Sequence, residues 1–376
     1  MRSRRVGVTT FVRLMREHAT AQAALEALPE VARAAGASDY KACPLPVVEQ
    51  ELKSARYAGA QFIAYGSPDY PAQLSDISDP PPFFWAVGDV ALLKRSCVAL
   101  VGARNASSLG TRMARRMAHD LGESGHVVVS GLARGVDTAA HAAALKTGTI
   151  AVMASGVDVI YPTENTVLGE EIGRDGGLRL SEAPMGMSPQ ARHFPQRNRI
   201  ISGLSRAVVV VEAAARSGSL ITARTALDQG RDVLAVPGHP FDARASGCNM
   251  LIRDGATLVR GAEDVIEIIG AVSAESASAP VAGAETTFPE GQDQDAARPE
   301  SGAHTLPGPQ APERPKAETR ALPQQILDRL GPSPLAEDQL IRDLALPAAA
   351  ITPELVTLEL DGRIQRHPGG LVNRLD

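Results

Sequence analysis

A glycine-rich loop at residues 102–110 contains the residue types that bind phosphate groups. It reads Gly102-Ala-Arg104-Asn-Ala-Ser107-Ser-Leu-Gly110 and lies between an apolar run and a helical pattern. Glycine lets backbone N–H groups approach an anion, and a helix N-terminus favours negative charge. An arginine guanidinium can donate two parallel hydrogen bonds to phosphate oxygens. The loop therefore predicts a phosphate site, although a tight strand-to-helix turn without a ligand has the same glycines. Neither a GxGxxG fingerprint nor a P-loop motif is present.

A second polar loop, residues 130–141, also joins an apolar run to a helical pattern. Its positions suited to ligand contact are Ser130, Gly131, Arg134, Gly135, Asp137 and His141. In a doubly wound sheet, such loops open at the carboxyl edge of the strands, where ligands bind. We expect this loop and the first to face one crevice. Two structural roles stay open: Asp137 as a helix cap, and His141 as a residue packed against the sheet.

Residues 192–199 combine three arginines with one aromatic ring. The candidate contacts are Arg192, Phe194, Arg197 and Asn198. Charge for the sugar–phosphate backbone and a ring for one base suit a flexible single strand, while a solvated basic turn is the alternative. Because aromatic residues make up only 3% of the chain, binding must depend mainly on phosphates.

A fourth segment is expected to complete the wall of the crevice. It is an apolar run followed by a polar helix entrance, with candidate positions Glu212, Ser217, Gly218, Ser219 and Thr222.

Seven short apolar runs must position these loops. They lie at residues 98–101, 127–129, 150–153, 178–180, 208–211, 233–236 and 257–259, with helical patterns between them. Continuous rather than alternating apolar runs are typical of parallel strands that are covered on both faces. The sequence therefore predicts the α/β class, with a Rossmann-like, doubly wound, mostly parallel sheet over residues 66–270.

Three further segments flank this core. Residues 1–65 have helical spacing and predict a small helical, SAM-like domain, whereas residues 271–320 are rich in Pro, Ala and Glu and predict a disordered linker. Residues 321–376 predict a winged helix of three helices and a hairpin, with Thr352 as N-cap and Pro353 at the first helical position.

The distribution of charge separates the front of the chain from its tail. Residues 271–320 hold eight acidic and four basic residues, and residues 321–376 hold eight and five, so residues 1–270 carry +2 of the net −5. The three cysteines are scattered, which disfavours disulfides and zinc, and we expect no cofactor or metal. No apolar run approaches the roughly 18 residues of a membrane span, so we expect a cytoplasmic protein without membrane contact.

The ordered series of motifs resembles the bacterial DNA-processing protein A family, also called Smf. The resemblance covers about residues 66–260 and rests on Gly102-x-Arg104, Ser130 to His141, Ser155-Gly156, Tyr161-Pro162, Asn165, Ser181-Glu182, Phe194 to Ile201, Glu212 to Thr222 and Pro237-Gly238. It implies a core that binds single-stranded DNA, forms homodimers and loads the recombinase RecA onto incoming DNA in natural transformation. By resemblance, Arg104 would hold phosphate, and Arg192 and Phe194 would flank the strand.

Two features of the sequence argue against DNA contacts by the domains that flank the core. The first domain lacks the Gly-x-Gly hairpin of a helix-hairpin-helix, so we assign it no DNA contact. The recognition helix expected at residues 353–360 has Glu354 and Glu359 but no Lys or Arg, which argues against duplex binding there. An enzyme related to nucleotide phosphoribohydrolases is the alternative, with Glu182 or Glu212 as acid or base, but the PGGxGT run of those enzymes is missing.

The dimer implied by the resemblance needs an apolar surface away from the crevice. We place it in residues 251–269, at Leu251, Ile252, Val265 and Ile269. The alternative is that these side chains only pack the last helix onto the sheet.

Overall fold

The core of the protein is one twisted sheet with helices on both faces. The computed structural model describes residues 1–18, 20–36, 39–270, 322–367 and 370–375, so the expected linker at residues 271–320 lies outside the described residues. The parallel strands are β3 (Cys97–Val101), β4 (Val127–Ser130), β5 (Thr149–Val152), β6 (Leu178–Ser181), β7 (Ala207–Val210), β8 (Asp232–Ala235) and β9 (Thr257–Leu258). All seven expected strands are present, which confirms the mostly parallel α/β class.

The strand order places a topological switch beside β3. The sheet runs β1-β2-β6-β5-β4-β3-β7-β8-β9, so the chain winds outward from β3 to β6 and then returns to β7 on the other side of β3. Helices on either side of such a switch diverge and leave a crevice at the carboxyl ends of the two strands. The loops after β3 and β7 are the first and fourth candidate segments of the sequence.

Alternate side chains of the central strands enter two different cores. Val98 and Leu100 of β3 pack in one cluster of buried residues, and Ala99 and Val101 pack in the other. This period of two explains why the strands are apolar throughout, since successive strand side chains point to opposite faces and both faces are covered here.

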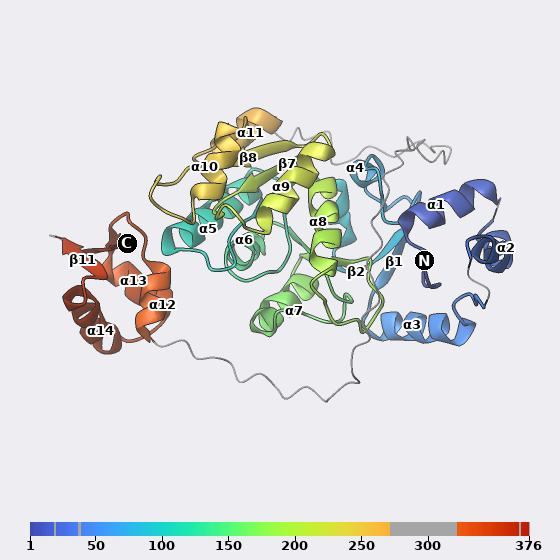
Figure 1. The fold of residues 1–376 in the computed structure, drawn as a ribbon, viewed down its shortest axis with the longest axis horizontal. Helices are drawn as coiled ribbons and strands as arrows, with labels where there is room; N and C mark the ends of the chain where they lie inside the picture. The colour runs from blue at the N-terminus through green and yellow to red at the C-terminus, as the bar shows by residue number, and fades with distance from the viewer. Residues whose placement is uncertain (19, 37–38, 271–321, 368–369, 376) are drawn as a thin grey trace.

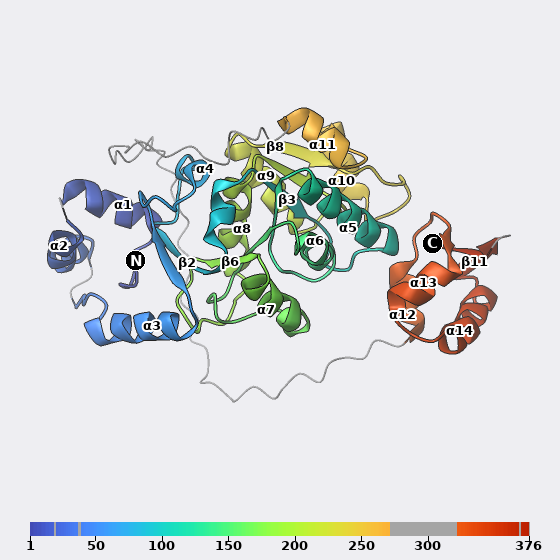
Figure 2. The same cartoon turned by 180° about the vertical axis from the view of Figure 1, so that it is seen from behind.

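The helices divide between the two faces. One face is covered by α5 (Ser108–Glu123), α6 (Val136–Ala144), α7 (Thr166–Arg174) and α11 (Ala262–Ile269). The other is covered by α4 (Ala72–Ser75), α8 (His193–Leu204), α9 (Ser219–Asp228) and α10 (Ser246–Arg253). Figure 1 shows α8 and α9 in front of the sheet, and the reverse view in Figure 2 brings α5 and α6 forward. Short 3-10 turns, η1 (Val90–Lys94) and η2 (Thr163–Asn165), join the remaining elements.

Two antiparallel strands that we did not expect extend one edge of the sheet. Strand β2 (Phe83–Gly88) pairs with β6, and β1 (Gln61–Ala64) pairs with β2. Strand β1 precedes the expected boundary at residue 65, so the sheet includes residues that we placed in the helical domain. The helices before it are α1 (Val8–Glu17), α2 (Ala21–Ala34) and α3 (Leu45–Tyr57). Glu51 of α3 joins this domain to the sheet, because it accepts hydrogen bonds from Arg2 and from Trp85 of β2.

The C-terminal residues form the expected winged helix, with one difference at its last helix. Its elements are α12 (Leu322–Arg329), β10 (Leu335–Ala336), α13 (Glu337–Leu344), α14 (Ala348–Leu360), β11 (Ile364–His367) and β12 (Leu371–Arg374). Helix α14 begins after Pro347, so Thr352 is not its N-cap and Pro353 lies inside the helix. The run of alanines at residues 348–350 has high helix propensity and starts the helix one turn earlier. Within the described residues, no helix is long and apolar enough to cross a membrane.

Candidate nucleic-acid interface

A cleft of about 710 Å³ opens at the switch point between β3 and β7. We refer to it as the switch cleft. It is lined by the end of β3 and residues 102–105 after it, by Ala214 and residues 216–219 after β7, and by the first turns of α8 and α9. The crevice is therefore built from segments that are about 110 residues apart in the sequence. Three of the four candidate segments meet there, and the second, residues 130–141, supplies only Ala133 and Asp137.

Arg104 and Phe194 form the accessible contact pair of the switch cleft. The guanidinium carbon of Arg104 lies 5.1 Å from the centre of the Phe194 ring, and Tyr161 lies 6.0 Å from the same ring. Arg104 is exposed and forms no hydrogen bond or ion pair with any residue that the structure describes. Its charge is thus available to a ligand, and the ring beside it offers a surface for one base.

The entrance of α9 supplies neutral donors on the opposite wall. Ser217, Gly218 and Ser219 precede or begin this helix, and the hydroxyls of Ser217 and Ser219 are 2.7 Å apart. The N–H groups of Leu220 and Ile221 donate to the carbonyls of Ser217 and Gly218, so the two hydroxyls and the positive end of the helix dipole are what this helix offers an anion. Thr222 and Asn198 also line the cleft, although Thr222 is almost fully buried.

The first loop is held in place by Glu212, which does not face the switch cleft. The buried Glu212 carboxylate accepts hydrogen bonds from the backbone N–H (2.9 Å) and the hydroxyl of Ser107, whose oxygen in turn caps α5 at the N–H of Gly110. A Cβ at Gly110 would overlap this carboxylate, and one at Gly102 would lie 2.6 Å from a methyl group of Val136. Burial raises the pKa of Glu212, and the Ser107 hydrogen bonds oppose that shift. Glu212, Ser107 and Gly110 therefore shape the loop and do not line the switch cleft.

The second loop has a strained backbone that buried side chains stabilise. Leu132 has φ of +54°, which is uncommon for a residue with a branched side chain. His141 is fully buried: its Nε2 accepts from the N–H of Leu132 (3.3 Å), and its Nδ1 lies 2.7 Å from the Thr149 hydroxyl. Asn165 donates to the Leu132 carbonyl at 2.9 Å. The packing alternative for His141 is correct, and burial lowers its pKa to about 3, so the ring is neutral.

Arg197 lines the switch cleft but is largely buried, and its guanidinium supports the surrounding loops. It is 6% exposed, donates to the carbonyl of Val152, and packs its guanidinium against Gly131, where a Cβ would overlap it. Burial lowers the pKa of Arg197 to about 10, so it keeps its charge, which Asp137 helps to balance. Asp137 does not cap its own helix; it accepts from the N–H groups of Gly131 and Ala133 in the preceding loop.

The other expected contacts lie outside the switch cleft. Ser130 is buried and donates to the carbonyl of Leu100. Arg192 is exposed and lies next to His193, away from the cleft lining. Arg134 and Gly135 line a different groove, next to the winged helix. Glu182, the other conceivable acid or base, is paired with Arg199, which also contacts Asp79.

Three polar residues of the switch cleft were missed by the sequence interpretation. Asn105 follows Arg104, Arg216 is exposed after β7, and Arg244 precedes α10. Asn105 and Arg216 lie within the motif segments and had the polar character to be chosen. Nothing in the sequence around Arg244 indicates the cleft, because the fold alone brings that loop beside β7.

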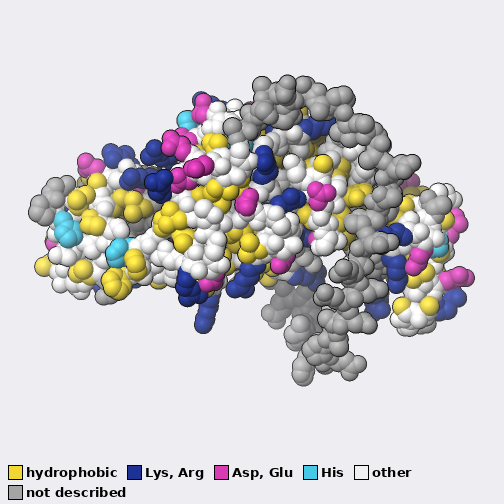
Figure 3. All heavy atoms as spheres, turned by 90° about the horizontal axis from the view of Figure 1, so that it is seen from above, with side chains coloured by type: hydrophobic (Ala, Val, Ile, Leu, Met, Phe, Trp, Pro, Cys, Tyr) yellow, Lys and Arg dark blue, Asp and Glu magenta, His cyan; other side chains and the backbone are white. Residues whose placement is uncertain are grey.

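The switch cleft has more cationic than anionic side chains among its described lining residues. In the face shown in Figure 3, Lys and Arg side chains are interspersed with Asp and Glu. The switch cleft is lined by four arginines, Arg104, Arg197, Arg216 and Arg244, and Asp137 is the single carboxylate among its described lining residues. Such a site favours a polyanion over a neutral ligand.

The residues expected at a dimer interface are mostly inside the protomer. Val265 is fully buried, Ile269 is 5% exposed and both pack in the core cluster under α5, α6 and α11. Leu251 is buried in the opposite core, and Ile252 packs partly against it. The packing alternative accounts for these four side chains, and Ile269 does not point outward as we expected.

Comparisons with known proteins match each domain of the chain to a family model. Residues 61–270 match the model of a family described as DNA recombination-mediator protein A, residues 1–54 match a DprA-like N-terminal HHH domain, and residues 310–370 match a DprA winged helix domain. The N-terminal match names the helix-hairpin-helix class although the Gly-x-Gly hairpin is missing.

Individual relatives extend over most of the chain. Protein Smf of Escherichia coli is 34% identical over 343 residues, which is 89% of this chain and 83% of that protein. The DNA processing protein DprA of Streptococcus pneumoniae is 49% identical over 199 residues, 52% of this chain and 70% of that protein.

Two solved structures share the fold. DNA processing protein A of Streptococcus pneumoniae has a TM-score of 0.55 and 38% identity, with 70% of this chain and 98% of that chain covered. The Helicobacter pylori protein, described for its single-stranded DNA binding mode, has a TM-score of 0.51 and 31% identity, covering 56% of this chain and 95% of that chain. With a core match over more than half of its residues and relatives along nearly its whole length, the chain belongs to the DNA recombination-mediator protein A family, whose members are called DprA or Smf.

Proposed function

We propose that this protein binds single-stranded DNA in the switch cleft and acts without catalysing a reaction. The observation that carries the proposal is the pairing of the exposed Arg104 with the Phe194 ring in the first turn of α8, in a cleft that the exposed Arg216 also lines. Cations for phosphates and one ring for a base are what a flexible strand needs. The single-stranded DNA binding mode described for the Helicobacter pylori relative supports the same ligand.

The carboxylates near the cleft have roles that leave no free acid or base among the described lining residues. Asp137 accepts two backbone N–H groups, and Glu212 is bound to Ser107 behind the first loop. A hydrolase needs such a group within hydrogen-bond reach of its substrate. This supports binding without catalysis, and it disfavours the phosphoribohydrolase alternative.

The direct test measures single-strand binding by the full chain. Arg104→Ala should weaken binding of oligo-dT at least several-fold, since a hydrogen bond to a charged group contributes about 1.5–3 kcal/mol, and should lower the salt slope by about 0.7. Arg253→Ala, an exposed arginine paired with Asp254, is the matched control. Fluorescence anisotropy over a range of salt concentrations gives both quantities. Equal affinity and slope for the two variants would remove Arg104 from the site, and preference for duplex would contradict the proposal.

We further propose, from the family resemblance, that a homodimer of this protein protects incoming DNA in the cytoplasm and loads RecA onto it. The assay is RecA nucleation on single strands that are coated with a single-strand binding protein. Addition of the protein should shorten the nucleation lag, and Arg104→Ala should lose this effect. An unchanged lag with the wild-type protein would contradict RecA loading while leaving DNA binding intact. Light scattering of the same preparation tests the dimer.

A further inference from the structure

A second groove, of about 1070 Å³, runs between the core and the winged helix. It meets the switch cleft at Arg104 and Asn105, which line both. One wall consists of α5 and α6, and the other consists of α12 and the end of α13. We refer to it as the interdomain groove. Because the two sites share these residues, a ligand held at Arg104 can continue from one into the other.

The interdomain groove is strongly basic in a chain whose net charge is −5. Among the residues that the structure describes, five arginines line it against two carboxylates, Glu164 and Asp343; the arginines are Arg104, Arg115, Arg134, Arg329 and Arg342. The winged helix is acidic overall, but Glu354 and Glu359 of α14 are not among the lining residues. The domain thus presents α12 and α13 to the groove in place of its recognition helix.

Most of these arginines are free to exchange their present partners for phosphate. Arg115 is exposed and has no hydrogen bond or ion pair with any described residue. Arg134 lies 3.5 Å from Glu164 with both side chains about 60% exposed, and Arg342 donates to Gln339 at 3.3 Å. Exposed pairs of this kind contribute little to stability, so breaking them costs little.

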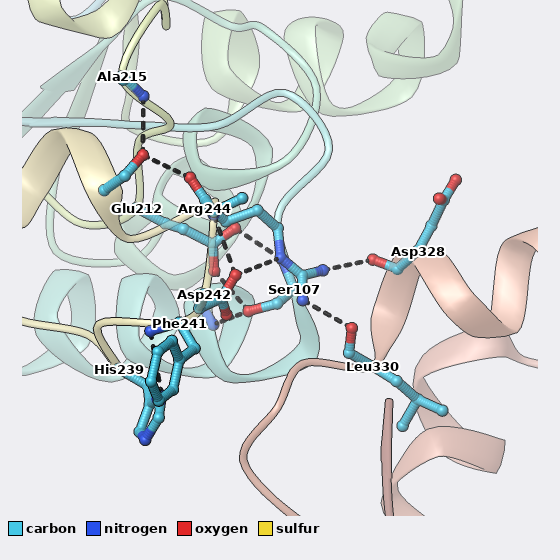
Figure 4. A network of polar contacts seen from close by, with 12 residues as sticks. Ser107, Glu212, Ala215, His239, Phe241, Asp242, Arg244, Asp328 and Leu330 are labelled. Atoms are coloured by element: carbon cyan, nitrogen blue, oxygen red, sulfur yellow. Dashed lines mark hydrogen bonds and ion pairs between the residues drawn. The ribbon is translucent and has the colours of Figure 1, made fainter. Parts of the chain in front are cut away.

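Arg244 fixes the winged helix against the core and so defines the groove. Its two terminal nitrogens donate to the carbonyls of Asp328 (2.7 Å) and Leu330 (2.6 Å) at the C-terminal end of α12, as Figure 4 shows. Cations are favoured at that end of a helix because its last carbonyls are unpaired. Arg329 of the same helix donates to the carbonyl of Ala106 in the first loop, so two arginines join the domains.

We propose that the interdomain groove continues the path of the single strand beyond the switch cleft, with Arg115 of the core and Arg342 of the winged helix on its phosphates. The proposal rests on single-strand binding in the switch cleft. The described residues that line the groove include no aromatic side chain, so its contacts are with the sugar–phosphate backbone and not with the bases. Binding in the interdomain groove should therefore depend on the length of the strand and on the salt concentration, and not on the base sequence.

The test compares short and long strands on the full chain. Oligo-dT of about 6 nucleotides fills one site of this size, whereas about 20 nucleotides reaches beyond it. The double variant Arg115→Ala, Arg342→Ala should bind the short strand like wild type, but bind the long strand more weakly, with a salt slope lower by about 1.4. The control is Arg112→Ala, Arg363→Ala, which removes one arginine from α5 and one from the winged helix outside the groove.

The possible outcomes separate this proposal from the proposed function. Equal long-strand affinity and slope for the groove and control variants would overturn the groove while leaving the switch cleft intact. Weaker binding of a duplex by the groove variant, with single-strand binding unchanged, would assign the groove to duplex DNA and also overturn it. If wild type binds neither strand length, single-strand binding itself fails, and the extension fails with it.

Discussion

Replacing Gly135 with alanine should test whether the second loop positions the first. Gly135 has φ +78° and ψ −119°, a conformation that suits glycine in a type II′ turn and strains other residues. A Cβ there would overlap the carbonyl oxygen of Ala103 and lie 2.7 Å from that of Arg104. Both obstacles are backbone atoms, so they cannot rotate away as a side chain would.

The expected loss of stability follows from these two effects. Strain at such a backbone position costs about 1–3 kcal/mol, and an overpacked contact costs about 1–3 kcal/mol more. The sum of about 2–6 kcal/mol corresponds to a fall in Tm of roughly 5–20 °C for a domain of about 200 residues. Relief of the overlap must move the loop that carries Arg104, so single-strand affinity should also fall.

Gly230→Ala is the matched control for this prediction. Gly230 has φ +68° and no atom within 4 Å of a Cβ, so alanine there meets the backbone strain alone. It precedes β8, at the edge of the sheet opposite the switch cleft. Thermal unfolding and anisotropy with oligo-dT measure both effects. If Gly135→Ala destabilises no more than Gly230→Ala and keeps wild-type affinity, the close approach of the two loops does not position Arg104.

Three other changes test separate parts of the structure. Phe194→Ala should weaken single-strand binding by about 1–3 kcal/mol, because a base loses its stacking partner. The control Phe241→Ala removes a ring that is 78% exposed and lies outside the cleft lining, so it should leave affinity unchanged. Equal effects of the two substitutions would exclude a specific base contact at Phe194. The pKa of His141 is lowered from 6.5 to about 3 in the fold, so its contribution is complete above about pH 6.5 and is lost as the pH falls. Wild type should lose about 2 kcal/mol between pH 7 and pH 5 through this residue. In urea unfolding His141→Gln should show a shallower pH dependence, and parallel curves would contradict a neutral buried ring. Ile269→Glu should unfold the core instead of separating protomers, because Ile269 is 5% exposed. The control Ile268→Glu, at a 37% exposed position, should stay folded. A folded Ile269→Glu monomer in light scattering would instead support Ile269 at a dimer interface.

The elements of the core were predictable because their signal is local. Continuous apolar runs such as residues 98–101 are typical of strands covered on both faces, and all seven were placed correctly. The antiparallel edge strands were not predicted, although residues 83–87 are apolar. The start of α14 was misplaced because Thr352-Pro353 has the chemistry of a helix start, while the preceding alanines propagate the helix through it.

The sequence by itself determined the α/β class, the winged helix, the family resemblance and the presence of Arg104 and Phe194 in segments suited to a polyanion. Only the tertiary structure decided which polar residues line the switch cleft. His141, Arg197 and Glu212 were all chosen as candidate contacts for their residue types, but each is buried and bonded to backbone groups. The physical reason is that a side chain's role depends on burial and partners, which come from strands and helices distant in the sequence. For the same reason, the interdomain groove could not be predicted: the net charge of the winged helix is an average, and docking through Arg244 selects the basic side that faces the core.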